Sequence, residues 1–336
     1  MTSAPKLGGF KVLKGVNRIS LALPKAHPLP RLLRLIAGEK INLPYFTCVQ
    51  GESAWGLHLA VESADRDRTV TLIQESCGTI PDEAASVILS IFPHRSDPTI
   101  AARLLGLFDQ ESLALGAVGN SPSAISIVLD EGLLSEASSA LFEVFQFNTY
   151  RTPSDWKLAQ RGKEELYKEV VASYQEQRPK TYGLEIADRH DFVSAGLVDG
   201  NLTPFGTTLH ACSQHGFNLA FLSLGPPHPE RGETLTFCIP GSNGKAFARI
   251  LNDLRSENAL ISRCRAAVFT MNGPHFGDRH GIVSELLRAF EEHRIDLLGL
   301  SCTIASVTGV VPSSQLDSAV KAITSSFEVP GVVKKT

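Results

Sequence analysis

The stretch that decides the fold runs from Ala266 to Cys302 and reads AAVFTMNGPHFGDRHGIVSELLRAFEEHRIDLLGLSC. Its opening residues are apolar or β-branched, which is typical of a buried strand. A segment rich in glycine and proline follows, and Asp278 is a good N-cap for a helix. The next apolar residues fall on one helical stripe, and a second apolar run begins at Leu297. The stretch therefore predicts a strand, a turn, an amphipathic helix and a second strand.

The residues that follow complete a recognisable unit. A further strand is predicted over 306–311, a second amphipathic helix over 314–327 and a closing strand over 329–333. The resulting order is β-α-β-β-α-β, which is that of the ferredoxin-like split unit of about 70 residues.

The same pattern recurs along the chain, which has 336 residues. The openings of the second strands mark the four copies: Ile41-Asn42-Leu43, Leu113-Ala114-Leu115, Phe217-Asn218-Leu219 and Ile295-Asp296-Leu297. Internal repetition of this kind indicates an architecture built from copies of one supersecondary unit. The sequence predicts an α+β fold of four ferredoxin-like βαββαβ modules, arranged as two tandem pairs joined by a linker helix.

The predicted boundaries follow from the repeats. They are an N-terminal tail (1–14), module one (15–83), module two (84–148), a linker helix (149–183), module three (184–262) and module four (263–333). Thr152-Pro153 is a helix-start signal, and an apolar stripe on the charged segment that follows favours a helix that packs one half on the other. A solvated spacer is the alternative.

Composition excludes several classes of protein. The formal net charge is −3, so there is no basic footprint for nucleic acid. No run of about 18 apolar residues spans a membrane, and the start lacks an apolar signal core. Six scattered cysteines without CxxC spacing indicate free thiols in a reducing cytoplasm.

Modules two and four carry motifs that resemble a known family. Ser90-Ile91-Phe92, 95–103 and 125–130 look like the second ACT module of an aspartate kinase regulatory region. Residues 277–283, with Ile295-Asp296-Leu297, are similar to the widespread ACT strand-turn-helix signature. The resemblance covers nearly the whole chain outside the linker. It implies a regulatory region without the kinase domain, because only a short tail precedes module one.

The resemblance further implies that the modules bind amino acids between paired copies, near the turn after the first strand and the start of the second. A helix N-terminus suits an α-carboxylate, and a nearby amide or carboxylate can hold the α-ammonium group. The candidate ligand-binding residues at these places are Asn201, Thr203, Pro204, Phe205, Gly206 and Asn218 in module three, Asp278, Arg279, His280, Gly281, Ile282 and Asp296 in module four, Asp97 in module two and Asn42 in module one.

A purely structural interpretation of these candidates remains open. Asp97, Asp278 and Thr203 are residue types that cap helices, and the repeated Asn or Asp before the second strand is typical of a turn. The recurrence of that Asn or Asp in three modules favours binding, and module three is the best candidate site. Loop histidines such as His94 and His275 are not at metal-ligand spacing and are expected to be solvated.

No catalytic motif is visible. There is no nucleophile elbow or Walker loop, and Gly241-Ser242-Asn243-Gly244-Lys245 is too short for a phosphate loop. The sequence thus predicts a non-catalytic, cytoplasmic amino-acid sensor with no cofactor and no metal. Its partners are an amino-acid effector and either a second copy or a partner enzyme. The alternative is a regulatory subunit of an aspartate kinase-like enzyme; a transcriptional regulator would need a DNA-binding helix pair, which is not visible.

Overall fold

The computed structural model describes residues 4–160, 178–228, 232–241, 245–257, 261–274, 276, 279–303 and 306–335. The first half of the chain forms β1 (Lys6–Leu7), β2 (Gly9–Pro24), α1 (Leu29–Gly38), β3 (Tyr45–Gln50), β4 (Ala54–Glu62), α2 (Arg66–Cys77), β5 (Asp82–Phe92), α3 (Pro98–Gln110), β6 (Ala117–Asn120), β7 (Ile125–Asp130), α4 (Leu134–Val144), β8 (Gln146–Phe147) and α5 (Pro153–Gln160). The second half forms β9 (Gly183–Gly196), α6 (Thr203–Gln214), β10 (Phe221–His228), β11 (Gly232–Pro240), α7 (Lys245–Glu257), β12 (Ile261–Asn272), α8 (Ile282–Glu292), β13 (Gly299–Thr303), β14 (Ser306–Pro312), α9 (Leu316–Ser326) and β15 (Val332–Lys335).

The strands join in one large sheet of 13 strands rather than in separate small sheets. Its order is β11-β10-β6-β7-β5-β2-β4-β3-β13-β14-β12-β9-β15. An additional pairing between β11 and β9 closes all strands but β15 into a ring. The long strands β2 and β5 pair from Gly9↔Phe92 to Ser20↔Asp82, with a register shift between Leu13 and Val16 that lets them bend from one side of the ring to the other.

The predicted fold class is wrong in its arrangement. The expectation was four modules in two tandem pairs, but β3 pairs with β13, which joins the first repeat to the fourth. Likewise β6 pairs with β10, which joins the second repeat to the third. Sequence periodicity reports the local order of elements, whereas the choice of which strand edges meet depends on contacts far apart in the chain. The repeats therefore merge into one continuous sheet.

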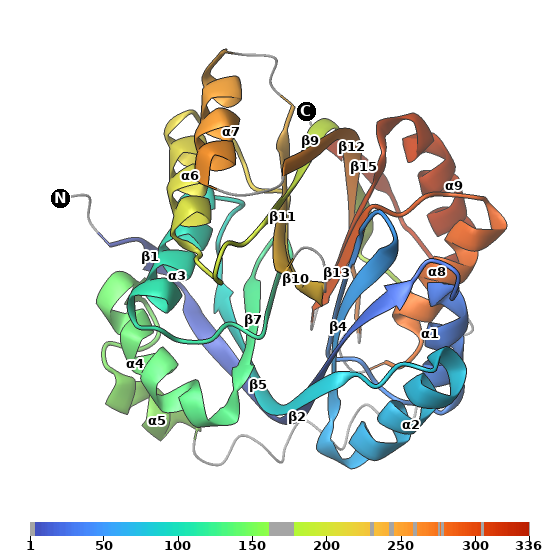
Figure 1. Ribbon diagram of the computed structural model, residues 1–336, viewed down its shortest axis with the longest axis horizontal. Coiled ribbons are helices and arrows are strands. Elements are labelled where there is room, and N and C mark those ends of the chain that lie inside the picture. Colours follow the sequence, from blue (N-terminus) through green and yellow to red (C-terminus); the bar gives the residue numbers. More distant parts are fainter. Residues whose placement is uncertain are drawn as a thin grey trace.

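Helices cover the sheet on its two outer sides (Figure 1). α3, α4, α6 and α7 lie on one side, and α1, α2, α8 and α9 on the other. Each helical layer has its own apolar core against the sheet. The inner face of the ring holds two smaller apolar clusters, one around Tyr45 and the other around Phe221. Strand β3 is consequently buried on both faces, as expected of a strand between two layers.

The stretch predicted as an N-terminal tail (1–14) contains paired strands. Lys6–Leu7 pairs with Gln146–Phe147 in a small parallel sheet, and β2 already begins at Gly9. Phe10 is buried and stacks on Trp156 of α5, with ring centroids 4.9 Å apart. This stretch of chain is thus part of the packed structure.

Only the beginning of the predicted linker helix is described. α5 starts at Pro153, and Asp155 closes a capping box, since Thr152 Oγ1 accepts the N–H of Asp155 at 3.1 Å and Asp155 Oδ2 accepts the N–H of Thr152 at 3.0 Å. Residues 161–177 of the linker lie outside the described residues.

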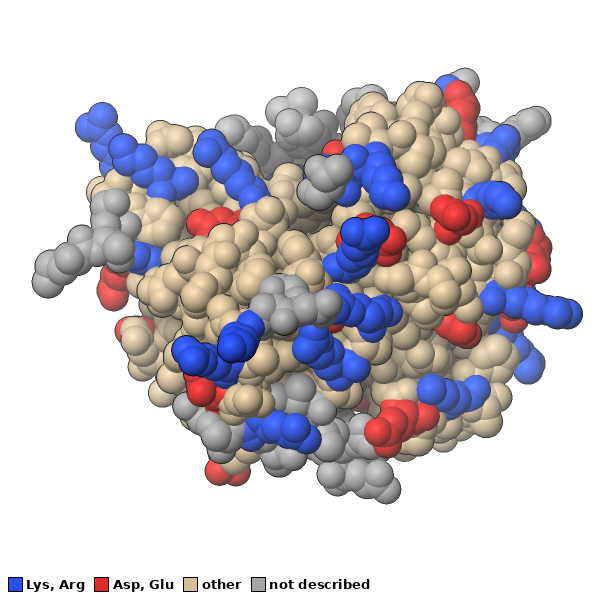
Figure 2. Space-filling view, turned by 90° about the horizontal axis from the view of Figure 1, so that it is seen from above, with Lys and Arg blue, Asp and Glu red and all other residues tan. Residues whose placement is uncertain are grey.

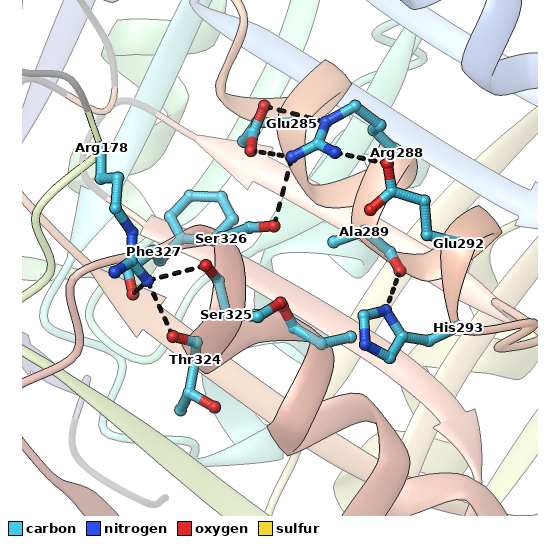
Figure 3. A network of polar contacts seen from close by, with 11 residues as sticks. Arg178, Glu285, Arg288, Ala289, Glu292, His293, Thr324, Ser325, Ser326 and Phe327 are labelled. Atoms are coloured by element: carbon cyan, nitrogen blue, oxygen red, sulfur yellow. Dashed lines mark hydrogen bonds and ion pairs between the residues drawn. The ribbon is translucent and has the colours of Figure 1, made fainter.

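The described residues resume at Arg178, whose side chain binds the C-terminal end of α9 (Figure 3). Its guanidinium donates to the carbonyl oxygens of Thr324 and Ser325 at 2.8 Å and of Phe327 at 2.9 Å. A cation at a helix C-terminus satisfies carbonyls that have no partner within the helix. No helix among the described residues has the length and apolar character that crossing a membrane requires.

Candidate binding site at the paired helix ends

Helices α3 and α6 pack side by side with each helix start next to the other helix's end. At one end, Thr99 Oγ1 donates to Ser213 Oγ at 2.7 Å, and Ser213 Oγ donates to Asp97 Oδ1 at 3.0 Å. At the other end, Asp109 accepts the Thr203 hydroxyl and the N–H of Leu202. Close packing needs a glycine, because a Cβ at Gly206 would lie 3.3 Å from the Ala102 carbonyl oxygen.

Most of the module three candidates serve this packing. Phe205 is fully buried, and Pro204 and Gly206 are buried with it, so these three residues belong to the packed interior. Asn201 Oδ1 accepts the N–H of Thr203 at 2.9 Å, a local contact just before the N-cap residue Leu202 and the first residue of α6. Asn218 is exposed and remains available to a ligand.

The start of α3 contacts the segment that leads from Asn218 into β10. The N–H of Leu219 donates to the Ser96 carbonyl oxygen at 2.7 Å. Asp97 caps α3 by accepting the N–H of Thr99 at 2.9 Å, as its structural interpretation predicted. The structure therefore brings Asp97 and Asn218, predicted in different modules, to the two sides of one interface.

His94 supports this interface and was misjudged from the sequence as a solvated loop residue. Its side chain is fully buried, Nδ1 accepts the N–H of Ser96 at 3.1 Å, and Nε2 donates to the Ser121 carbonyl oxygen. Burial lowers the pKa of His94, which keeps the ring neutral. The imidazole of His94 contacts the turn of Arg95 and Ser96, whose positive φ values of 53° and 58° are uncommon outside glycine. Its one sequence signal was the matching position of His275.

The first and fourth repeats form the equivalent interface. Arg34 of α1 and Glu291 of α8 make an ion pair at 3.1 Å. Between the two helices lies a cavity of about 10 Å³, lined by Ile41 and Leu43 on one side and by Arg279, Gly281 and Ile282 on the other. The predicted turn residues thus face the predicted strand opening. That volume accommodates about one water, so an amino acid requires the two repeats to separate.

The other candidates of this interface are less well placed. Asp296 is exposed and bound by Gln315, whose Nε2 donates to its carboxylate at 2.9 Å. His280 is half-buried, and burial with the nearby Arg279 lowers its pKa. Asn42 is half-buried between the cavity-lining Ile41 and Leu43. Asp278 lies outside the described residues. The helix it was expected to cap begins at Ile282, after Gly281 with φ 87°.

A cationic surface also stands out in the view from above, where Lys and Arg side chains gather across the middle of the face (Figure 2). On β12, Arg263 and Arg265 ion-pair with the buried Asp191 of β9, at 2.7 and 3.3 Å. On β15, Lys335 pairs with Glu185 at 2.5 Å. The two arginines share the one carboxylate of Asp191, so these three side chains together keep a net positive charge.

Comparison with known proteins gives a fold but no sequence family. No family model and no curated protein matches the sequence. The aspartate kinase from Synechocystis matches the whole chain with a TM-score of 0.76 at 14% identity. The matched region is 58% of that kinase, so this chain spans little more than half of its length. The chain therefore has an aspartate kinase-like fold over the matched region.

Shorter matches add no argument. The ligand-free regulatory subunit of aspartate kinase from Thermus thermophilus covers 44% of this chain with a TM-score of 0.39 at 13% identity, and 98% of that subunit is matched. The Clostridium acetobutylicum aspartate kinase covers 46% of this chain and 37% of its own length, with a TM-score of 0.39 at 13% identity.

These comparisons overturn three expectations drawn from the sequence. The structure that this chain matches throughout is that of an entire aspartate kinase, not of a regulatory region alone. The interpretations as a regulatory region without a kinase, and as a non-catalytic sensor, are therefore corrected. The alternative of a regulatory subunit is not supported either, because the match over the whole chain is to an entire aspartate kinase.

Proposed function

We propose that the chain takes part in amino-acid phosphorylation of the aspartate kinase type, in which ATP phosphorylates a carboxylate of an amino acid. The observation that carries this proposal is the superposition of the entire chain on the aspartate kinase from Synechocystis, with a TM-score of 0.76. A cytoplasmic location is part of the proposal, since all six cysteines are free thiols.

The reaction product gives a direct test. The purified chain is incubated with ATP, Mg²⁺ and L-aspartate in the presence of hydroxylamine, which traps an acyl phosphate as a coloured hydroxamate. We expect hydroxamate that depends on the chain, on ATP and on L-aspartate, with the remaining amino acids assayed in parallel. Product no higher than in reactions without the chain, for every amino acid, would overturn the proposal.

We propose further that an amino acid binds at the paired ends of α3 and α6. The first N–H groups of α3 are already used, because Pro98 has none and those of Thr99 and Ile100 donate to Asp97, so the contacts proposed here come from side chains. Asn218 is exposed beside Leu219, whose N–H binds Ser96 at the α3 start, and an amide oxygen there can accept a hydrogen bond from an ammonium group. A homodimer or a partner enzyme remains a proposal for the macromolecular partner.

Replacing Asn218 tests this site. A hydrogen bond to a charged group contributes about 1.5–3 kcal/mol, so Asn218→Ala is expected to weaken amino-acid binding by roughly 10- to 100-fold in calorimetry. Asn252→Ala, at an exposed position of α7, is the matched control and should leave affinity unchanged. Unchanged affinity in Asn218→Ala would remove this residue from the site.

A further inference from the structure

A larger cavity lies away from the helix ends, at one end of the ring of strands. It has a volume of about 320 Å³ and is bordered by the β3–β4 hairpin and by residues of β9, β10, β11 and β12. Its lining residues come from the first and third repeats. Its volume falls at the lower end of the range of small-molecule sites.

Glycines and a strand irregularity create this space. Gly56, Gly196 and Gly225 line the cavity, so the wall consists of backbone alone at these three positions. β10 and β11 lose their regular register between Gly225 and His228, which is how bulges open a sheet beside a site. A Cβ at Gly56 would lie 2.9 Å from Pro226 Cδ, so the approach of β4 to β10 requires glycine at this position.

The lining combines apolar residues with hydrogen-bonding groups and carries one charge of each sign. Hydroxyl groups of Ser194, Thr234 and Ser262 and the amide of Gln50 contribute hydrogen-bonding groups. Lys25 and Glu52, both exposed side chains, are the charged members of the described lining. That lining includes no aromatic ring on which a base would stack and a single cation, which disfavours nucleotides.

We propose that this cavity binds a small zwitterionic solute, a free amino acid or a close analogue. Its carboxylate would lie toward Lys25 and its ammonium group toward Glu52, while the hydroxyl-rich wall receives a short polar side chain. The site uses residues separate from those at the α3 and α6 ends, so its existence does not depend on the proposed phosphorylation.

Calorimetry on the full chain tests the charge requirement. The twenty amino acids are first screened by thermal shift, and the one with the largest shift is titrated as the free acid, as its N-acetyl derivative and as its carboxamide. Each derivative lacks one charge and should bind at least tenfold more weakly. Equal affinity for the free acid and either derivative would overturn the zwitterion assignment.

Variants locate the binding site. Lys25→Gln and Glu52→Gln are each expected to weaken binding at least tenfold, and Ser262→Trp is expected to abolish it by filling the cavity. Lys11→Gln and Glu143→Gln, at exposed positions elsewhere, are the matched controls and should bind like the unmodified chain. Urea unfolding at unchanged midpoint verifies that each variant is folded.

The outcomes separate this proposal from the earlier ones. Weaker binding in Lys25→Gln and Glu52→Gln, with hydroxamate formation unchanged, supports a separate solute site. Binding that persists in all three cavity variants and is lost in Asn218→Ala would overturn the cavity site while supporting the helix-end site. The absence of a shift with any amino acid would overturn the cavity site, whatever the result of the kinase assay.

Discussion

At the scale of single residues, the face of β14 that packs under α8 leaves little tolerance for added volume. A Cβ at Gly309 of β14 would lie 2.1 Å from Phe269 Cζ, and Phe269 is itself packed edge-on against Phe290 with centroids 5.5 Å apart. Gly106, within α3, has no atom within 4 Å of the corresponding position. An added methyl group would therefore clash at position 309 but would meet open space at position 106.

Alanine at each position tests this difference. Gly309→Ala is expected to lower the free energy of unfolding by about 1–3 kcal/mol, because Phe269 must move in a packed core. Gly106→Ala is the control and is expected to raise it by about 0.5–1 kcal/mol, because alanine is the better helix former. Urea unfolding measures both. Equal effects of the two substitutions would contradict the packing argument.

The residue types predicted the local hydrogen-bonding roles of side chains well, but they did not predict which of the candidate side chains are buried. Asp97 was predicted as a ligand-binding residue with capping as the alternative, and the capping hydrogen bond is present because the chemistry of that role is local. His94 was not recognised as a buried support, because the carbonyl it binds, that of Ser121, comes from another part of the repeat. Phe205 was taken as a binding residue, although its place in the core follows from the packing of α6 on α3.

At the scale of elements, α3 and α6 depend on each other through their ends. Asp97 caps α3 and also accepts the hydroxyl of Ser213, while Asp109 at the other end binds Thr203 and Leu202. Each carboxylate thus links its own helix to the neighbouring one: loss of Asp97 removes the acceptor of a donor from each helix, and loss of Asp109 that of two donors at the start of α6.

Replacing the Asp97 cap tests this dependence. Asp97→Ala is expected to lower the free energy of unfolding by about 0.5–2 kcal/mol, because it removes the acceptor for the N–H of Thr99. Asp97→Asn keeps an acceptor oxygen and should recover most of the loss. Glu143→Ala, at an exposed position of α4, serves as the control for a change of charge. Equal losses in the Ala and Asn variants, seen by urea unfolding, would argue against a capping role.

Apolar periodicity predicted where the helices lie, but the start of α8 differs from the predicted one. Asp278 was expected to cap the helix, whereas α8 begins at Ile282 after Gly281 in a left-handed conformation. The sequence signal was the N-cap preference of Asp278, and a local preference of this kind places a helix start only to within a few residues.

At the scale of the whole molecule, three buried histidines make stability depend on pH. Burial lowers the pKa of His58 to about 3 and also lowers the pKa values of His94 and His190. Since the unfolded chain binds protons on these residues near pH 6.5, it holds more protons than the folded chain below that pH. The stabilisation is present above pH 6.5 and decreases as the pH falls.

The pH profile of unfolding measures this effect. Each such histidine is expected to remove up to about 1.4 kcal/mol of stability per pH unit below 6.5. Urea midpoints at pH 7.5, 6.5 and 5.5 should therefore fall, and His94→Gln should make the fall less steep. His215→Gln, at an exposed position, is the control. A flat profile between pH 7.5 and 5.5 would contradict the prediction.

Global arrangement was the level that the sequence predicted least. The order of strands and helices within each repeat is a local property and was visible in the apolar periodicity. The partners of β3 and β6 are strands of distant repeats, β13 and β10, and all four repeats present similar edges. Nothing local to an edge strand states which of several similar edges it joins, so the tandem pairing was a reasonable but wrong choice.

The pairing of β3 with β13 has a consequence for synthesis on the ribosome. Phe46 lies opposite Cys302, so this edge of β3 finds its partner only after the fourth repeat has been translated. Until then β3 pairs with β4 on one side and leaves its other edge open, the kind of edge that invites intermolecular association. Completion of the ring is therefore a late, long-range event, and nascent-chain chaperones would meet this protein with its first repeat still open.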